Sequence, residues 1–591
     1  MPVFSELARK STFVVLIVLT AVAGALPAKA QAQGAGQLPP ELISYADQIY
    51  INGKIITVDK DFSVREAIAV RDGKILAVGT TAAIQRYAGP KTQRVDLAGK
   101  TMIPGIVDSH VHLQSELPED EEFVKSKEPK LRDYENAAKI PGGTYEEMLA
   151  SIKQVVDGRK PGTWVRATIA EAQFAKLFSD KVKVADLDRV APNNPLVVGA
   201  LQSRINTKVM DEFRKKFGTV SEEIMETGSL DTIDGRSVVG DLLIEHPMES
   251  LYEPFKKHMK WYAKFGVTTW GSSLTPLSFI NIYHEMDRRG EMPIRFGFSH
   301  SVGVTDYPEA WRFYQRLGDL SGLGTDMLWI TGSGIVVADL TPTTGCISLA
   351  KETSRCPLAR KDAERRRALF EMVKNGQRIT STHVSGDGSA DSMMDIIEEA
   401  SAAAGFTPEQ VKAKMHTMDH CGMYPRPDQI PRANKLGIMF SCGGDRIDNG
   451  VPEMLTERFG EEYAHKWPSP VASIIKSGGK VAGHGEGVEG ESYFVNASML
   501  VTRTNSKGKV WGKAEAVDRR TMLRMYTING AEYMLRADRI GSIEVGKFAD
   551  LAVLDKDFLA VPDDQLKTIK ALLTVVGGKV VWQDPSFQMT K

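Results

Sequence analysis

Histidine residues at the ends of apolar runs are the clearest chemical signal in this sequence. Asp108, His110 and His112 occupy alternate positions of TMIPGIVDSHVH, so on a strand their side chains point the same way. His383 ends the run RITSTH, and His420 ends HTMDH in the next unit. Each histidine alone is more often structural, but imidazole is a common ligand for divalent transition metals, and four can hold one catalytic ion with a position open for water. Their shared position predicts a metal site formed by His110, His112, His383 and His420.

The segments that carry these residues alternate between strand-like and helical patterns. Strand-like runs occupy 101–112, 267–273, 293–301, 327–337, 378–386, 416–421, 436–442 and 480–487. Between them lie segments with amphipathic helical spacing, such as DSMMDIIEEASAAAG. Repeated strand-then-helix units predict an α/β fold with a parallel sheet and right-handed crossovers. Because this number of strands closes a (β/α)8 TIM barrel, and because polar residues gather at strand C-terminal ends, we favour a barrel over an open doubly wound sheet.

The predicted barrel covers 101–534, with an insertion at about 120–250 that we expect to form part of the substrate pocket. The chain on either side of the barrel, 33–100 and 535–591, consists of short β-rich runs broken by turn dipeptides. The turns are Asn52-Gly53, Asp72-Gly73 and Gly577-Gly578. Because such fragments are too short to form a stable sheet alone, we expect both ends to pair into one small β-sandwich-like domain.

Residues 1–32 have the pattern of a secretory signal peptide. Arg9 and Lys10 precede an apolar run at 12–26, and small residues suitable for cleavage follow at 28–32. The run is short for a membrane span, although an uncleaved anchor is the alternative. We therefore expect a periplasmic or secreted protein with no stable membrane insertion after cleavage.

Composition narrows the range of partners. The formal net charge is −1 and no basic stripe is present, so nucleic acid is not expected as a partner. No cluster of Lys or Arg indicates a phosphate-rich ligand, and we expect a small-molecule substrate. The four cysteines form no C-x-x-C pair, which argues against a thiol-based zinc site; whether Cys346 and Cys356 pair is left open. A homo-oligomer is compatible with the sequence and not indicated by it.

Four segments carry a resemblance to a known family. MIPGIVDSHVHLQ, THVSGDGSADSMMDII and MDHC are similar to metal-binding segments of the amidohydrolase superfamily. RMYTINGAEYMLRADRIGSIEVGKFADLAVLDKD resembles the C-terminal signature of its branch typified by N-substituted formamide deformylase, the Amidohydro_3 type. The resemblance covers nearly all of the mature chain. It implies a barrel with a β-sandwich-like companion domain, a zinc-class metal, and hydrolysis of an amide-like C–N bond.

The sequence departs from this family at two places. Relatives usually end the last barrel strand with Gly-Ser-Asp, whose Asp binds metal and acts as a base; here Glu486 falls at that position, in VAGHGEG. Glu486 can ligate or take a proton, and His484 is a second candidate base that would face the same way; a Gly-rich loop with solvated side chains is the alternative. Many relatives also carry a bridging Lys that is absent between Leu328 and Asp339. One divalent metal, first Zn²⁺, is the simpler expectation, and two ions with a bridging Glu486 remain open.

Three functions fit these residues. The first is hydrolysis by a metal-activated water, with Glu486 or His484 as the base and with Asp108 and Asp387 orienting imidazoles through hydrogen bonds. The second is a hydratase, lyase or isomerase reaction on the same scaffold, because a fold does not determine a reaction. The third is a secreted binding protein that has lost catalysis. We favour hydrolysis of a small, partly apolar amide-like compound.

Overall fold

The computed structural model describes residues 45–111, 137–169, 171–200, 203–218, 222–230, 248–274, 279–301, 311–335, 337–339, 345–349, 356, 358–485 and 493–588. The predicted signal peptide, His112 and Glu486 lie outside these residues. The expectations that concern them therefore stay predictions.

Strands from both ends of the described chain pair in one sheet. The six-stranded sheet has the order β22-β21-β20-β7-β2-β3, and β20 (Leu551–Leu554) runs antiparallel to β7 (Thr101–Pro104). Its other strands are β2 (Lys54–Ile56), β3 (Val64–Arg65), β21 (Ala571–Val576) and β22 (Lys579–Gln583). A second sheet, β5-β4-β1-β6, consists of β1 (Ala46–Ile51), β4 (Ala67–Arg71), β5 (Lys74–Gly79) and β6 (Ala88–Asp96). Apolar side chains of both sheets, such as Tyr50 and Leu573, share one buried core.

Two of the three turn dipeptides form hairpins. Asp72-Gly73 joins the antiparallel pair β4 and β5, and Gly577-Gly578 joins β21 and β22. The third dipeptide, Asn52-Gly53, does not join a hairpin, because β1 and β2 belong to different sheets. Asn52 has φ 56°, and the chain there crosses from one sheet to the other.

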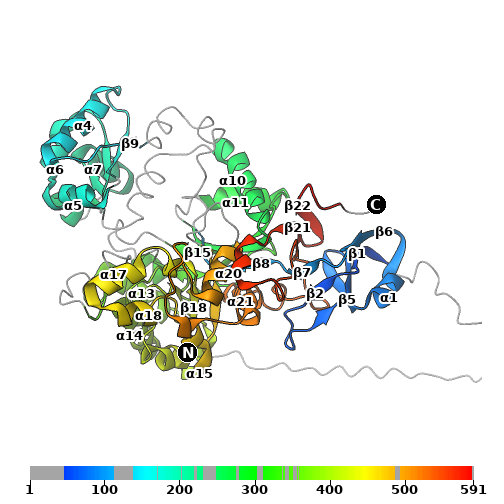
Figure 1. The fold of residues 1–591 in the computed structure, drawn as a ribbon. Helices are drawn as coiled ribbons and strands as arrows, with labels where there is room; N and C mark the ends of the chain where they lie inside the picture. The colour runs from blue at the N-terminus through cyan, green and yellow to red at the C-terminus, as the bar shows by residue number, and fades with distance from the viewer. Residues whose placement is uncertain are drawn as a thin grey trace, which may run out of the picture. The chain divides into compact units, whose positions relative to one another are not determined.

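The inserted segment, cyan in Figure 1, has a sheet and an apolar core of its own. Its strands follow the order β13-β12-β11-β10-β9, with β9, β10 and β11 parallel. They are β9 (Ala138–Lys139), β10 (Val165–Thr168), β11 (Leu196–Gly199), β12 (Ser203–Ile205) and β13 (Ser229–Leu230). The helices are α4 (Tyr145–Asp157), α5 (Ala172–Lys181), α6 (Val184–Val190), α7 (Thr207–Phe217) and α8 (Glu222–Thr227). The sequence analysis placed an insertion at about 120–250 and did not predict this small α/β unit.

The remaining strands are all parallel to their neighbours. One sheet has the order β16-β15-β14-β8 and another the order β17-β18-β19. The strands are β8 (Ile106–Asp108), β14 (Val267–Ser273), β15 (Arg295–Ser301), β16 (Leu328–Gly334), β17 (Thr417–His420), β18 (Met439–Cys442) and β19 (Val481–Gly483). Single parallel bridges link 379–383 to β16 and β17, and Ser109 N donates to Gly483 O at 3.1 Å beside β8 and β19. The order of pairing is therefore circular.

Two of the expected strands differ from the prediction. The run 101–112 splits into β7 and β8 at Gly105, where the two strands join different sheets. A Cβ added at Gly105 would lie 2.1 Å from Oγ1 of Thr268, so this crossing point requires glycine. The run 378–386 contributes single bridges and no regular strand, and Ser381 within it has φ 52°.

Helices follow most of the parallel strands and enclose the largest apolar core. Trp270, Trp329, Phe298 and Phe440, which lie within the parallel strands, are buried core residues. Among the helices of the described ranges, none has the length and apolarity that crossing a bilayer needs.

The longer helices are α10 (Met248–Ala263), α11 (Ile280–Arg288), α13 (Glu364–Lys374), α14 (Asp387–Ala404), α16 (Gln429–Leu436), α17 (Val451–Phe459) and α20 (Tyr493–Thr502). The shorter ones are α1 (Thr81–Ile84), α12 (Trp311–Tyr314), α15 (Pro408–Ala413), α18 (Glu461–Lys466), α19 (Val471–Lys476), α21 (Arg519–Met525) and α22 (Ile528–Tyr533), with 3₁₀ turns η2 (Gln85–Tyr87), η6 (Asp445–Ile447), η7 (Lys513–Glu515) and η8 (Asp563–Thr568).

Candidate active site

Four buried histidines from distant parts of the chain form one cluster. His110 follows β8, His420 ends β17, and His484 follows β19. His383 lies at the end of the segment 379–383, which is linked to its neighbours by single β-bridges. The ring centroid of His420 lies 4.6 Å from that of His110, 3.8 Å from that of His383 and 5.4 Å from that of His484. The structure thus brings together three of the expected metal ligands and one candidate base, all at the C-terminal ends of parallel segments.

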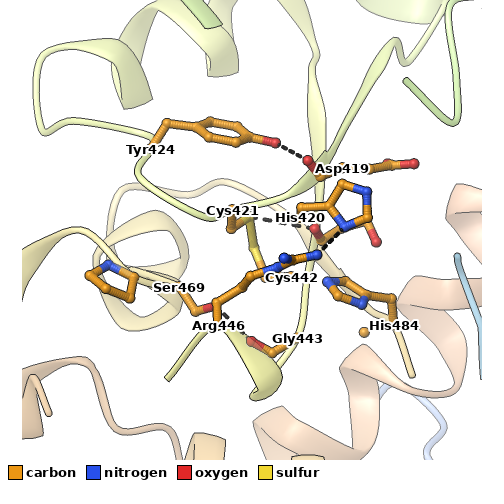
Figure 2. The surroundings of a disulfide bond; sticks show 12 residues. Asp419, His420, Cys421, Tyr424, Cys442, Gly443, Arg446, Ser469 and His484 are labelled. Atoms are coloured by element: carbon orange, nitrogen blue, oxygen red, sulfur yellow. Dashed lines mark hydrogen bonds between the residues drawn. A yellow bond between two sulfur atoms is a disulfide. The ribbon is translucent and has the colours of Figure 1, made fainter. Parts of the chain in front are cut away.

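The backbone around His420 departs from a regular strand. His420 has φ 90° and Cys421 has φ 46°, a left-handed conformation that residues with a side chain rarely adopt. The turn is held by its surroundings: a disulfide joins Cys421 to Cys442 at the end of β18, and Tyr424 OH donates to Asp419 O (Figure 2). Strained backbone conformations of this kind persist only where the neighbouring structure enforces them, and they are frequent at functional sites.

A carboxylate orients His110. Oδ2 of Asp419 lies 2.7 Å from Nδ1 of His110, and Oδ1 of Asp419 accepts a hydrogen bond of 2.6 Å from Tyr533 OH. Burial and the Asp419 carboxylate raise the pKa of Tyr533, so its hydroxyl stays protonated and donates. A carboxylate beside one ring nitrogen of a histidine sets the orientation of the imidazole. Sequence reasoning missed Asp419, although it immediately precedes His420.

A buried ion pair lies on the other side of the cluster. Arg446 Nη2 is 2.6 Å from Nδ1 of His420 (Figure 2). Arg446 Nε is 3.0 Å from Oδ2 of Asp445. Oδ1 of Asp445 is in turn 3.9 Å from Nε2 of His484. Both charged residues belong to η6, which follows β18. Gly443, just before them, has no room for a side chain, since an added Cβ would lie 2.6 Å from Cε1 of His484. The sequence analysis missed this pair; the only signal was a Gly-Gly-Asp-Arg run after a strand.

Asp108 joins the ends of β8 and β19. Its Oδ1 accepts hydrogen bonds from the backbone N–H groups of His110 (3.1 Å) and Gly485 (3.0 Å), and its Oδ2 accepts one from Tyr493 OH. Burial raises the pKa of Asp108 to about 7, while these hydrogen bonds act to lower it. The expectation that Asp108 bonds to an imidazole is not met by these contacts. Asp108 instead positions the backbone on which His110 and His484 are carried.

Asp387 lies outside the cluster. Its carboxylate accepts hydrogen bonds from Ser348 N (2.9 Å) and Arg426 Nη1 (2.5 Å), at the first turn of α14. An acidic side chain at a helix N-terminus paired with arginine is a structural arrangement. The orienting role expected for Asp387 is therefore not supported by its contacts.

Asp339, and not Asp387, holds the backbone that follows His383. The backbone N–H groups of Ser385 and Gly386 donate to its carboxylate at 2.7 and 2.9 Å, and Cys346 N donates at 2.8 Å. Nε2 of His383 is 2.9 Å from the hydroxyl oxygen of Ser385. The Asp339 carboxylate thus fixes the loop that follows His383 and links it to the loop of the Cys346–Cys356 disulfide.

The donor types at this site fit a transition-metal ion. Imidazole is the ligand such ions prefer, and here four buried rings meet at strand ends. Within the part of the chain that the structure describes, no three His, Cys, Asp or Glu side chains are arranged to hold a metal ion together. The expected ligands His112 and Glu486 directly follow the described residues Val111 and Gly485 in the sequence.

The fold and site define the class of protein. Residues 93–582 match the amidohydrolase family (Amidohydro_3), and the chain belongs to this family. Among characterised relatives, it is 24% identical to N-substituted formamide deformylase of Arthrobacter pascens, over 90% of this chain and 97% of that protein. It is also 24% identical to Protein LONG AFTER FAR-RED 3 of Arabidopsis thaliana, over 92% of this chain and 93% of that one.

Solved structures share the fold. An uncharacterized metal-dependent hydrolase from Pyrococcus horikoshii superposes with a TM-score of 0.59 at 20% identity, covering 88% of this chain and 99% of that one. Another, from Pyrococcus furiosus, has a TM-score of 0.57 at 19% identity, covering 87% and 99%. The chain therefore has an amidohydrolase-type α/β fold.

Proposed function

We propose that this protein is an exported, metal-dependent amidohydrolase that cleaves an amide-like C–N bond of a small, partly apolar substrate. The observation that supports this most directly is the cluster of His110, His383, His420 and His484, all buried, with His420 at its centre. Membership of the amidohydrolase family supports hydrolysis, and the deformylase relative supports an amide as the bond that is cut.

The proposed architecture is a (β/α)8 barrel with a β-sandwich-like domain formed by both chain ends. The circular pairing order from β8 to β19 supports the barrel. Active sites of such barrels lie at the C-terminal ends of the strands, which is where the imidazoles gather. The shared core of the two terminal sheets supports the companion domain.

We propose that His110, His383 and His420, together with His112 and Glu486, provide the metal site. A bound zinc-class ion supplies Lewis acidity, which polarises a carbonyl and makes water a stronger acid. Asp419 holds the His110 ring in a fixed orientation. Asp108 and Asp339 hold the backbone segments that carry the histidines.

The proton of the attacking water needs a base. Glu486 and His484 are the two candidates, and either would return the proton to the leaving nitrogen. His484 is buried within the cluster, with its Nε2 3.9 Å from Asp445. Replacing Glu486 and His484 one at a time identifies which of them is the base.

Two formed disulfides support export. Cys346 pairs with Cys356 and Cys421 with Cys442, so every cysteine of the sequence is oxidised. Structural disulfides persist in oxidising compartments such as the periplasm, which agrees with the signal-peptide pattern of residues 1–32. We propose a periplasmic or secreted protein that acts on a small molecule and not on nucleic acid.

The proposal is tested with protein purified from an oxidising compartment. Elemental analysis gives the metal content, and a panel of N-substituted formamides, other amides, carbamates and unsaturated compounds is then assayed in ¹⁸O-labelled water. We expect metal in the protein, cleavage of an amide, one labelled oxygen in the released acid, and loss of turnover on chelation that added metal restores. Addition of water or rearrangement without cleavage would instead indicate a hydratase, lyase or isomerase. Protein without metal or turnover would indicate a binding protein.

A further inference from the structure

A pocket of about 650 Å³ lies at the N-terminal ends of the parallel strands. Most of its described lining residues come from segments that each lead into one of these strands: 319–321 before β16, 375–378 before the segment 379–383, and 410–414 before β17. The buried histidines, by contrast, lie at the C-terminal ends. The pocket is therefore separate from the candidate active site, and its volume is in the range of pockets that bind small molecules.

The lining of this pocket includes a buried positive charge, that of Arg378, which is 1% exposed. Its guanidinium donates hydrogen bonds to three backbone carbonyl oxygens, those of Thr331 (2.6 Å), Met415 (2.9 Å) and Tyr533 (2.8 Å). Burial lowers the pKa of Arg378 to about 10, so the guanidinium still carries its charge at neutral pH. Because these partners are neutral dipoles and not carboxylates, the charge of Arg378 is not neutralised where it lies.

The other two charged residues of the described lining balance each other. Nζ of Lys414 lies 2.8 Å from Oδ2 of Asp319. Oδ1 of Asp319 accepts hydrogen bonds from the backbone N–H (3.1 Å) and the hydroxyl (2.6 Å) of Ser321. Both carboxylate oxygens of Asp319 are therefore engaged within the protein, and a cationic ligand finds no unused carboxylate among the described lining residues. The net charge of this lining is the single positive charge of Arg378.

Apolar surface adjoins the ammonium group of Lys414. A Cβ added at Gly376 would lie 3.6 Å from Cζ of Phe406 and 3.9 Å from Nζ of Lys414, so the aromatic ring and the ammonium group both approach this glycine. Gly376 has φ 79°, a conformation that favours glycine, at the turn after α13. Ala413 and Leu535 extend the apolar part of the lining. A ligand that matches this lining has an apolar body and one negative charge.

We propose that this pocket is a second ligand site, which binds a small monocarboxylate with an apolar body. The side chain of Lys414 is 30% exposed, and its ammonium has three N–H donors, so it bonds to the carboxylate while keeping Asp319. Arg378 is too deeply buried to contact the ligand broadly and acts through its electrostatic field, which is strong at low dielectric. One negative charge balances Arg378, whereas a phosphate monoester carries close to two. The proposal goes beyond the proposed function and does not depend on it.

The test is a titration of the purified protein with 3-phenylpropionate, followed by isothermal titration calorimetry. 3-Phenylpropan-1-ol keeps the apolar body without the charge, and 3-phenylpropylamine reverses the charge. We expect saturable binding of the carboxylate, and binding of the alcohol and the amine that is weaker by at least about tenfold. Equal affinity for the carboxylate and the alcohol, or no saturable binding of the carboxylate below about 10 mM, would overturn the proposal.

Two variants locate the bound carboxylate. Ala413→Trp fills the pocket without changing its charge, and Lys414→Gln removes the ammonium group at a partly exposed position. Each should weaken binding by at least about tenfold, with circular dichroism to show that it is folded. Ala82→Trp, at an exposed position of α1 outside the pocket, is the matched control and should bind as the unmodified protein does. Unchanged affinity in Ala413→Trp and Lys414→Gln would place the carboxylate elsewhere and refute this site, while leaving the proposed function at the histidine cluster intact.

Discussion

Nδ1 of His110 lies 2.7 Å from Oδ2 of Asp419, and both side chains are buried. His110 follows β8 and Asp419 lies in β17, two strands that are distant in the sequence and do not pair with each other. The contact therefore links opposite parts of the circular strand order through the histidine cluster. It gives His110 a defined orientation, on which any metal chemistry at this site depends.

Replacing Asp419 by Asn removes the charge and keeps the shape. We expect Asp419→Asn to weaken metal binding or turnover by roughly 10- to 100-fold, the usual effect of losing the partner of a ligating histidine. Metal affinity is measured by competition with a chelating dye, and turnover on the substrate found in the panel. Asp564→Asn, at an exposed position of η8, is the control and should change neither quantity. Unchanged affinity and turnover in Asp419→Asn would refute the orienting role.

Tyr493→Phe removes the hydroxyl that donates to the buried carboxylate of Asp108. We expect the free energy of unfolding to fall by about 1–3 kcal/mol, because a buried acceptor loses its partner. Urea unfolding at neutral pH measures the change. Tyr463→Phe serves as the matched control, since Tyr463 is partly exposed and packs on Trp467 through its ring. Equal stability of the two variants would contradict the inferred role of Tyr493.

The Cys421–Cys442 disulfide ties the turn after His420 to the end of β18. We expect the double replacement of these cysteines by serine to lower stability by about 2–4 kcal/mol and to weaken metal retention. Thermal unfolding and elemental analysis measure the two effects. The Cys346–Cys356 pair is the comparison: its replacement should cost stability with a smaller effect on metal, because it does not adjoin a histidine of the cluster. The reverse order of the two effects on metal would contradict this assignment.

The base is identified by comparing Glu486→Gln with His484→Gln. The variant that removes the base should keep its metal and lose roughly 100- to 10,000-fold in kcat. If Glu486 is the base, His484→Gln should retain much more activity, and the reverse holds for His484. Full activity in Glu486→Gln would show that Glu486, the first candidate from the sequence, is not the base.

His258 on α10 makes stability depend on pH. Burial lowers the pKa of His258 to about 4, from an ordinary value of 6.5. The folded protein therefore keeps His258 neutral while the unfolded chain takes up a proton, so stability is full above pH 6.5 and falls as the pH drops towards 4. At pH 5 this residue should account for about 2 kcal/mol of lost stability relative to neutral pH.

His258→Phe keeps an aromatic ring next to Trp261 and Tyr262 and removes the titration. The loss of stability between pH 7.5 and pH 5, measured by urea unfolding, should be smaller by that amount. His284→Gln, at an exposed position of α11, should show the same pH dependence as the unmodified protein. An unchanged acid sensitivity in His258→Phe would show that His258 is not its source.

The apolar runs in the sequence were sufficient to predict most of the parallel strands. The apolar run at 267–273 is β14 as expected, and the runs around His420, Phe440 and Ala482 contain β17, β18 and β19. A short run between helical segments has few alternatives to a buried parallel strand. The same pattern failed at 101–112 and 378–386, where Gly105 and Ser381 interrupt the strand for reasons that lie in distant residues.

The sequence by itself determined the family and pointed to the histidines as the candidate chemical groups, because residue type, strand-end placement and a long C-terminal signature are all local properties. Only the tertiary structure decided which charged groups serve the histidines: Asp419 for His110, Arg446 with Asp445 for His420, and Asp339 for the His383 loop. Aspartate and arginine occur throughout the chain, and nothing in their spacing distinguishes these from solvated surface residues. These residues gain their roles because backbone turns with positive φ and the pairing of distant strands bring them next to the buried histidines. No local sequence pattern encodes these contacts.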